Sequence, residues 1–399
     1  MALVSPRPNP TRFVASKARL STFDRLVFAP RAARGQHLAF FDALRGIAVL
    51  GVVLVHAMIF LSSLGINVTR SLSPLISSGQ YGVQLFFIAS AVTLAYSHDR
   101  RKETGPSTRD FFLRRYFRIA PMYTLAALLY TGITCARHGL PNLDAVALNL
   151  CFLHPYSKEA FNTVPPGGWS VGVETQFYVL LPLLLPVVRN LRASLVFLAV
   201  SLAICLASYA ELRHLGVTVQ DNTFFYFWLP NQLPAFALGL VVYQTIKTSL
   251  FSPVVAEVRR PSPLLIAALA SLLGVFVVRV PSPLYHLVVL GPLALLVVGL
   301  ARAPWGALVN RPLCALGKTS FSIYLLHFLV IQVVGLFWKR FHLPIPGTLN
   351  LALFYGIVVA STSVVATFTH KTIEVKGGEL GNRLIESLKE RRKIATMVA

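Results

Sequence analysis

The sequence contains little charge for its length: 13% of its 399 residues are Asp, Glu, Lys or Arg, whereas 55% are hydrophobic. It also lacks a long polar stretch, which leaves no room for a second, water-soluble domain of about 100 residues. The hydrophobic residues instead fall in runs of about 18 or more, and such runs are typical of membrane-spanning helices. The composition therefore excludes an ordinary soluble globular protein and predicts an all-α, polytopic membrane protein.

Cysteines are few and are not arranged as a metal or disulfide motif. The four cysteines occur in or beside hydrophobic runs and form no C-x-x-C pair: Cys135, Cys151, Cys205 and Cys314. A disulfide framework and a thiolate metal site would both need clustered cysteines. We therefore expect no bound metal and no permanently bound cofactor, and we interpret the cysteines as packing residues.

Acidic residues are scarce, at 15 against 37 basic ones, and the formal net charge is +22. In a soluble protein this excess would suggest nucleic acid, but here the basic residues concentrate between particular spans, as cytoplasmic loops require. Residues 1–43 are basic and have no hydrophobic core like that of a cleaved signal peptide. We interpret them as a disordered cytoplasmic tail, residues 44–370 as the membrane domain, and residues 371–399 as a basic cytoplasmic C-terminal tail.

The hydrophobic runs predict about ten transmembrane helices with both termini in the cytoplasm. The predicted spans are 44–64, 80–97, 119–134, 170–188, 194–210, 224–246, 263–280, 285–301, 319–337 and 349–369. One further piece, "AVALNLCFLH" at 145–154, is too short to cross and is expected to be re-entrant or interfacial. This topology places most basic loops inside, although Lys339 and Arg340 fall outside.

The first predicted span contains two ionisable residues, Arg45 and His56. They are eleven residues apart, so their side chains share one helical face and are separated by about 16 Å along the axis. Arg45 alone is compatible with an interfacial anchor, and His56 with a core histidine bonded to a neighbouring helix. A histidine at this depth is also suited to be a general base or a proton relay, since it need not be charged at rest.

Two arginines at the end of the loop before the third predicted span form an R-x-x-R pair. Arg115 and Arg118 lie on one face of a predicted helix, in "FLRRYFRIAP". Guanidinium groups bind phosphate oxygens in a bidentate manner, so a phosphate-bearing cytosolic ligand or lipid headgroups would bind here.

The fourth predicted span begins after "PPGG" with a polar face. Ser170, Glu174 and Tyr178 follow one another at intervals of four residues. A carboxylate inside a span requires a partner, and we expect His56 to be that partner. The preceding Trp169 is either a substrate-binding residue or an interfacial belt residue.

A later span, "SFSIYLLHFLVI", contains a histidine on the same face as Ser320 and Tyr324. This residue, His327, is a further substrate-site candidate, and a purely structural role is the alternative.

Five sequence motifs together resemble those of the membrane acyltransferase 3 family, in the family's order. They are "FDALRGIAVLGVVLVHA", "GVQLFFIASAVTLAYS", "FLRRYFRIAPMY", "GGWSVGVETQFYVLLPLLL" and "SFSIYLLH". The resemblance implies a ten-helix fold, an acyl-CoA co-substrate, usually acetyl-CoA, and transfer to a hydroxyl group. The family's arginine and histidine match Arg45 and His56, its R-x-x-R pair matches Arg115 and Arg118, and its acidic residue matches Glu174.

The sequence differs from the family pattern in three ways. Thr175 stands where the family usually has a second acidic residue. The last span ends in "HKTIEVKGG", which resembles the family's "IE-x-P" ending, but Lys376 stands in place of the proline. No hydrolase-like domain follows the last span, so we expect the stand-alone form of the family.

These residues and the resemblance predict a membrane O-acyltransferase of the inner (plasma) membrane. It would transfer an acetyl group from cytoplasmic acetyl-CoA to a hydroxyl of a cell-surface or exported glycan or glycolipid. His56 would act as base, relay or transient acyl carrier, with Glu174 behind it, while Arg45, Arg115 and Arg118 would bind the donor phosphates. Outer loops such as 135–168 and 211–223 would select the acceptor.

The alternative is a proton-coupled secondary transporter of a sugar or an organic acid, with His56 and Glu174 as a proton relay. The absence of a second half resembling the first argues against it. An inactive acyltransferase-like scaffold is disfavoured because every expected chemical group is present.

Overall fold

The computed structural model describes residues 39–101, 107–217, 223–251, 259–278, 284–340 and 345–398, and these residues are helical or in loops, with no strand. They belong to one unit, Ala39–Ala399. Most of the tail that we predicted to be disordered, residues 1–38, lies outside the described residues. Residues 39–43 of that predicted tail are helical, because the first helix begins at Ala39.

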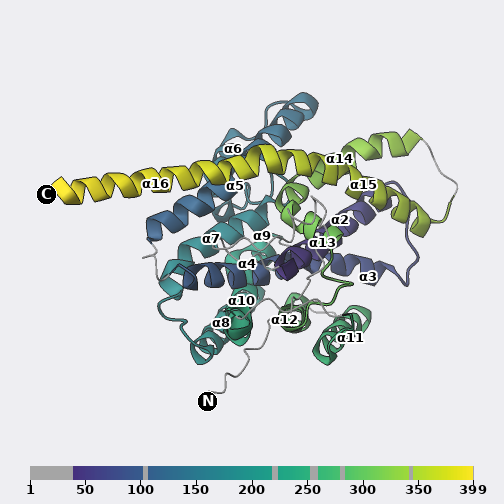
Figure 1. The fold of residues 1–399 in the computed structure, drawn as a ribbon. Coiled ribbons are helices and arrows are strands. Elements are labelled where there is room, and N and C mark those ends of the chain that lie inside the picture. The colour runs from purple at the N-terminus through teal and green to yellow at the C-terminus, as the bar shows by residue number, and fades with distance from the viewer. Residues whose placement is uncertain are drawn as a thin grey trace, which may run out of the picture. The chain divides into compact units, whose positions relative to one another are not determined.

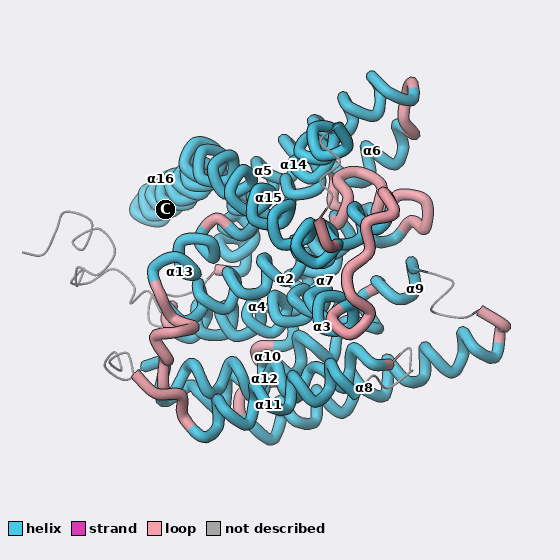
Figure 2. Tube along the Cα trace, turned by 90° about the vertical axis from the view of Figure 1, so that its right-hand side faces the viewer, coloured by secondary structure: helices cyan, strands magenta, loops and turns pink. Residues whose placement is uncertain are grey.

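The structure confirms the all-α fold class (Figures 1 and 2). The helices before residue 190 are α2 (Ala39–Ser63), α3 (Ser73–Ser77), the 3-10 turn η1 (Ser78–Tyr81), α4 (Gly82–Asp99), α5 (Thr108–His138), α6 (Leu143–Leu150), the 3-10 turn η3 (His154–Tyr156) and α7 (Gly168–Leu184). Those after it are α8 (Leu191–His214), α9 (Thr223–Phe227), α10 (Leu229–Phe251), α11 (Pro263–Val278), α12 (Tyr285–Arg302), α13 (Arg311–Lys318), α14 (Ser320–Arg340), α15 (Gly347–Thr369), the π-turn η4 (His370–Glu374) and α16 (Val375–Val398).

Eight helical stretches among the described residues are long and apolar enough to cross a membrane, which confirms a polytopic membrane protein. Two further predicted spans correspond to the shorter helices α7, of 17 residues, and α11, of 16 residues. The predicted short piece overlaps α6, whose 8 residues cover only about 12 Å. It is too short to cross the membrane, as the sequence indicated.

Helix α2 packs against α4, α13, α14 and α15. Its closest neighbours approach through glycines: a Cβ on Gly317 of α13 would collide with the carbonyl oxygen of Asp42, and one on Gly82 of α4 with that of Ala48. Small residues allow helix backbones to meet in this way. These contacts fix α2 along its axis, and they therefore fix the depths of Arg45 and His56.

The R-x-x-R pair lies inside a helix and not in a loop before one. We expected the third span to begin near Pro121, but α5 begins at Thr108 and continues through Pro121. A proline removes the backbone hydrogen bond to the carbonyl four residues earlier, here that of Phe117. Gly377 of α16 packs directly against this carbonyl and against the Pro121 ring. A neighbouring helix therefore covers the irregular turn, as in other membrane helices.

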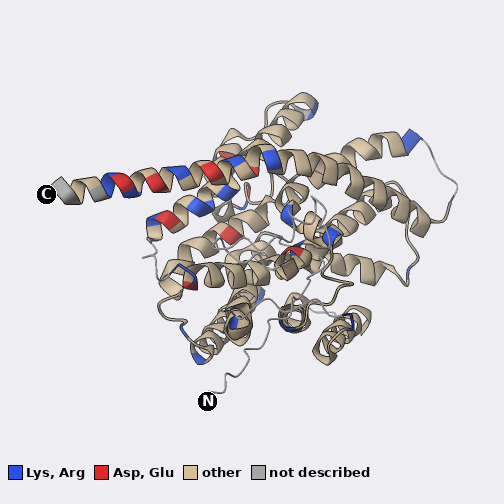
Figure 3. Ribbon diagram, viewed as in Figure 1, with Lys and Arg blue, Asp and Glu red and all other residues tan. Residues whose placement is uncertain are grey.

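The C-terminal tail is helical. Helix α15 continues through η4 into α16, which packs along α5 (Figure 1). At the π-turn, Glu374 accepts hydrogen bonds from Ser322 and from His370, the latter at 3.1 Å. Charged residues gather on α16 and on the first half of α5, whereas most other helices show few (Figure 3).

Candidate functional site

Two histidines from distant parts of the chain meet inside the helix bundle. The Nδ1 atom of His56 on α2 lies 3.2 Å from the Nε2 atom of His327 on α14. The His327 side chain is completely buried, whereas His56 is partly exposed. The ring of Phe328 packs against both imidazoles, with centroids 4.3 Å from His56 and 4.2 Å from His327. The structure thus supplies a partner for His56 that the sequence analysis had named only as a separate candidate.

The hydrogen bonds of this pair fix where its protons lie. His327 Nδ1 is 2.6 Å from the carbonyl oxygen of Tyr324, which only accepts, so this nitrogen carries the proton. Its Nε2 is therefore an acceptor when the ring is neutral. His56 Nδ1 faces that acceptor and also the carbonyl oxygen of Val52 at 2.9 Å, so it must be the protonated nitrogen. The basic lone pair of a neutral His56 is consequently on Nε2, on the opposite side of the ring.

One helical turn before His327, a hydroxyl pair connects α14 to the start of α7. Ser170 Oγ donates to the hydroxyl of Tyr324 at 2.7 Å, and that hydroxyl donates to the carbonyl of Gly167 at 3.0 Å. Gly167 has a φ of +80°, which favours glycine, and the Tyr324 ring packs against it. These contacts fix the N-terminus of α7 beside the histidine pair.

Glu174 lies one turn further along α7 and is held by two hydroxyl groups. Its Oε1 atom accepts from Ser90 of α4 at 2.5 Å and from Tyr178 at 2.7 Å. Tyr178 in turn stacks against the guanidinium of Arg115, which lies 5.9 Å from the ring centroid. Glu174 therefore belongs to a polar cluster formed by α4, α5 and α7.

Two arginines, Arg45 and Arg115, feel the charge of this carboxylate, and Arg118 lies near both of them. The charges of Glu174 and Arg118 act on Arg45 of α2, and those of Glu174 and Arg118 also act on Arg115. Arg45 additionally donates to Thr93 of α4 at 3.5 Å and lies 3.9 Å from Asp42. The expected donor-binding arginines are thus brought together, and the charge of Glu174 acts on two of them.

This geometry corrects the expectation that Glu174 lies behind His56. The charge of Glu174 acts on Arg45, and Arg45 and His56 are separated by about 16 Å along α2. The opposite directions of the two helices explain the separation: Ser170, early in α7, bonds to Tyr324 beside His327, whereas the charge of Glu174, one turn later, acts on Arg45 near the start of α2. Within the described residues, His56 has His327 as its side-chain partner, and Glu174 has Ser90 and Tyr178.

Trp169 is buried in an aromatic cluster. Its ring stacks on Phe227 with centroids 4.0 Å apart and meets Phe87 edge-on at 6.2 Å. It is 8% exposed, which excludes a lipid-facing belt residue. Trp169 therefore acts as a wall of the interior and joins α7 to α9.

The sequence analysis missed two polar residues next to the site. Ser90 lies within a quoted motif, but its spacing gave no sign that it would face Glu174. His154 in η3 is fully buried and bonds to the carbonyl of Gly168 at 3.1 Å, and burial lowers its pKa to about 4. It is therefore a neutral packing residue that positions the start of α7, and a short loop histidine offers no periodic signal that would reveal this.

The His56 Nε2 atom and the arginine cluster lie at the two ends of a row of polar side chains, which we call the polar column. The column runs from Arg115 and Arg118, through Glu174, then through Ser170 and Tyr324, to the histidine pair. The described residues contain no group of three or more His, Cys, Asp or Glu side chains able to hold a metal ion. The site suits proton transfer at one end and anion binding at the other.

Comparison with known proteins identifies similar chains. The family described as "Acyltransferase domain" matches residues 38–370. The exopolysaccharide production protein ExoZ of Rhizobium meliloti (strain 1021) is 29% identical over 301 residues, which are 70% of this chain and 86% of ExoZ. No solved structure matches.

Two further relatives are acyltransferases by name. The acyltransferase MdmB of Streptomyces mycarofaciens is 26% identical over 351 residues, covering 80% of this chain and 84% of MdmB. The O-acetyltransferase OatA of Staphylococcus aureus (strain NCTC 8325 / PS 47) is 21% identical over 385 residues, and that match covers 87% of this chain but only 57% of OatA.

Proposed function

This chain belongs to the acyltransferase domain family of membrane proteins, and from that premise we propose that it is a membrane O-acyltransferase. It transfers an acyl group, most simply acetyl, from cytoplasmic acyl-CoA to a hydroxyl of a cell-surface or exported glycan or glycolipid. The observation that supports this best is the histidine pair, because its hydrogen bonds leave the Nε2 lone pair of His56 free to accept a proton.

The proposed reaction is a direct transfer with His56 as general base. His56 Nε2 takes the proton of the acceptor hydroxyl while that oxygen attacks the thioester carbonyl. The C–S bond then breaks, and the departing thiolate takes the proton back from His56, which yields an ester and free CoA. During the attack His56 is an imidazolium, and its Nδ1–H remains bonded to His327 and to the carbonyl of Val52. His327 is a positioning residue that stabilises this charged form.

The arginine cluster is the proposed donor site. Arg45, Arg115 and Arg118 contribute three positive charges against the two carboxylates of Asp42 and Glu174, and a phosphate-bearing ligand supplies further negative charge. The long pantetheine arm of CoA would then run along α2 for the roughly 16 Å between Arg45 and His56. Glu174 orients the arginines and Tyr178, which is a different role from the one expected from the sequence.

The acceptor class rests on relatives and on position in the chain. ExoZ is named for exopolysaccharide production and OatA as an O-acetyltransferase. For this chain, a carbohydrate or glycolipid acceptor would approach His56 from the side of the predicted outer loops, 135–168 and 211–223. With both termini in the cytoplasm, the donor and the acceptor would reach the histidine pair from opposite sides of the inner membrane.

The purified protein in liposomes tests the proposal directly. Acetyl-CoA labelled in the acetyl group is added with a hydroxylated glycan or glycolipid extract, and ester-linked label in the acceptor is measured by mass spectrometry. His56→Ala should reduce transfer by about 10²- to 10⁴-fold, the usual contribution of a general base. His286→Ala is the matched control, since His286 is another buried histidine, on α12. Transfer that survives in His56→Ala would overturn the assignment of the base.

A further inference from the structure

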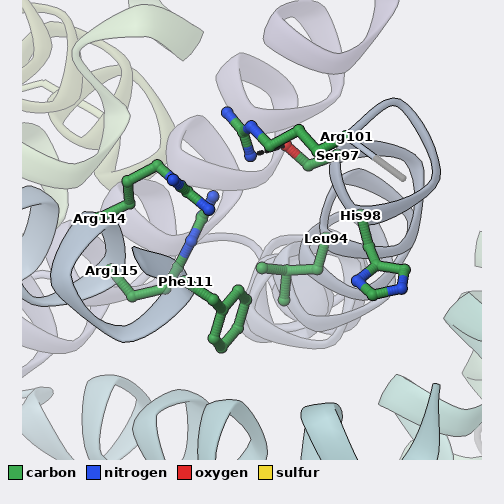
Figure 4. Close-up of a pocket in the computed structure, with 7 residues that line it drawn as sticks. All are labelled: Leu94, Ser97, His98, Arg101, Phe111, Arg114 and Arg115. Atoms are coloured by element: carbon green, nitrogen blue, oxygen red, sulfur yellow. Dashed lines mark hydrogen bonds between the residues drawn. The ribbon is translucent and has the colours of Figure 1, made fainter. Parts of the chain in front are cut away.

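A basic pocket lies beside the arginine cluster, between the end of α4 and the first turns of α5. Its polar lining comes from Ser97, His98, Arg101, Arg114 and Arg115. Figure 4 shows that Arg101 reaches into the pocket from one side, and Arg114 and Arg115 from the other. Arg115 lines this pocket and also contacts Tyr178, so the pocket adjoins the proposed donor site.

The pocket is strongly positive. Three guanidinium groups line it, and none of its lining residues that the structure describes carries a carboxylate. Arg101 lies outside the membrane spans, and its pKa is lowered by burial and by the nearby charges of Arg114 and Arg100. Ser97 accepts a hydrogen bond of 3.0 Å from Arg101, which holds this guanidinium at the pocket wall. Like charges held this close together are stabilised by a bound anion.

Two aspartates near the pocket each pair with a lysine outside it. Asp99, at the end of α4, pairs with Lys247 at 2.5 Å and accepts from Tyr243 at 2.5 Å. Asp110, on the first turn of α5, pairs with Lys389 of α16 at 3.2 Å, and its charge also acts on Arg114. Neither aspartate lines the pocket.

The other described lining residues are apolar. Leu94 and the ring of Phe111 form one side, and the guanidinium of Arg115 lies 6.0 Å from the centroid of that ring. An aromatic ring and guanidinium planes are surfaces on which a nucleobase stacks. Basic forks next to such a surface suit a nucleotide phosphate better than a simple inorganic anion.

We propose that this pocket binds the phosphate monoester on the nucleotide of the acyl donor, the 3′-phosphate of CoA. The inference rests on the proposed use of acyl-CoA and extends it. Consecutive residues on a helix point about 100° apart, so Arg114 and Arg115 contact different groups. Arg115 serves both the pocket and the Glu174 cluster, whereas Arg114, with Arg101 and His98, distinguishes CoA from donors that lack the 3′-phosphate.

The same chemistry is presented by the phosphate of an anionic lipid headgroup, and the experiment separates the two sources. The full-length protein is placed in phosphatidylcholine nanodiscs, and equilibrium binding of CoA and of 3′-dephospho-CoA is measured. The wild type should bind CoA more tightly. Arg114→Gln and Arg101→Gln should each reduce that preference by roughly tenfold, as expected for one lost charge-assisted hydrogen bond, and should leave binding of 3′-dephospho-CoA almost unchanged.

Arg100→Gln is the matched control, because it removes the same charge next to Arg101 but does not line the pocket. Equal wild-type affinity for the two ligands would overturn the inference while leaving the proposed function intact. If the wild type binds neither CoA nor 3′-dephospho-CoA, both the inference and the proposed function are wrong. Nanodiscs containing phosphatidylglycerol identify the other source. If this lipid abolishes the preference of the wild type for CoA but does not change CoA binding by Arg114→Gln, the pocket is a lipid headgroup site and the inference is wrong.

Discussion

The hydrogen bond between His56 and His327 should contribute to turnover and not to donor binding. Its acceptor, His327 Nε2, lies 3.2 Å from His56 Nδ1, and the carbonyl of Val52 provides a second acceptor at 2.9 Å. A hydrogen bond to a charged group contributes about 1.5–3 kcal/mol. Because this bond is long and shares its donor, we take the lower limit of about 1.5 kcal/mol, which corresponds to about a tenfold change in rate.

Two substitutions of His327 distinguish the effect of its hydrogen-bond acceptor from the effect of its side-chain volume. His327→Phe fills the completely buried site but provides no acceptor, so kcat for acetyl transfer should fall about tenfold with the Michaelis constant for acetyl-CoA unchanged. His327→Gln keeps an oxygen acceptor and should retain most of the activity. The assay is steady-state transfer from labelled acetyl-CoA, after size-exclusion chromatography has shown that each variant is folded.

Two results would refute this reasoning. Wild-type kcat in His327→Phe would show that the bond does not stabilise the imidazolium. A raised Michaelis constant with unchanged kcat would show that His327 contacts the donor instead.

Three further predictions concern other parts of the chain. Glu174→Gln should raise the Michaelis constant for acetyl-CoA roughly 10-fold with kcat nearly unchanged, since it loses one charged partner of the arginines; a selective loss of kcat would place Glu174 in the chemical step. Lys389→Ala should lower the free energy of unfolding by about 1 kcal/mol in thermal unfolding, since the buried Asp110 carboxylate loses Lys389 and keeps only the more distant Arg109, at 3.8 Å. Arg391→Ala, at an exposed position, is the control, and equal effects of the two substitutions would contradict the role of the Asp110–Lys389 pair. Incubation with labelled acetyl-CoA without acceptor should leave the protein unlabelled, and an acetylated His56 peptide in mass spectrometry would replace direct transfer by an acyl-enzyme.

Helix periodicity predicted the partition of the site residues onto faces. The eleven-residue step from Arg45 to His56 fixes one face and a separation of about 16 Å because an α-helix has constant rise and twist. The same rule placed Ser170, Glu174 and Tyr178 together, and the structure shows Tyr178 donating to Glu174 at 2.7 Å. Hydrophobic runs likewise predicted the all-α membrane fold, since the lipid interior leaves few alternatives.

The sequence by itself determined where the apolar spans lie and which residues share a face, because these depend on local geometry and on the solvent, but it missed the helical start of α5 and helix α16. Only the tertiary structure decided which faces meet. His56 and His327 are 271 positions apart in the sequence and form a pair, whereas Glu174 accepts a hydrogen bond from Ser90. The direction of α7 against α2 and the close backbone contacts of α2 with α4 and α13 set these depths, and such packing depends on side-chain shapes in several helices at once.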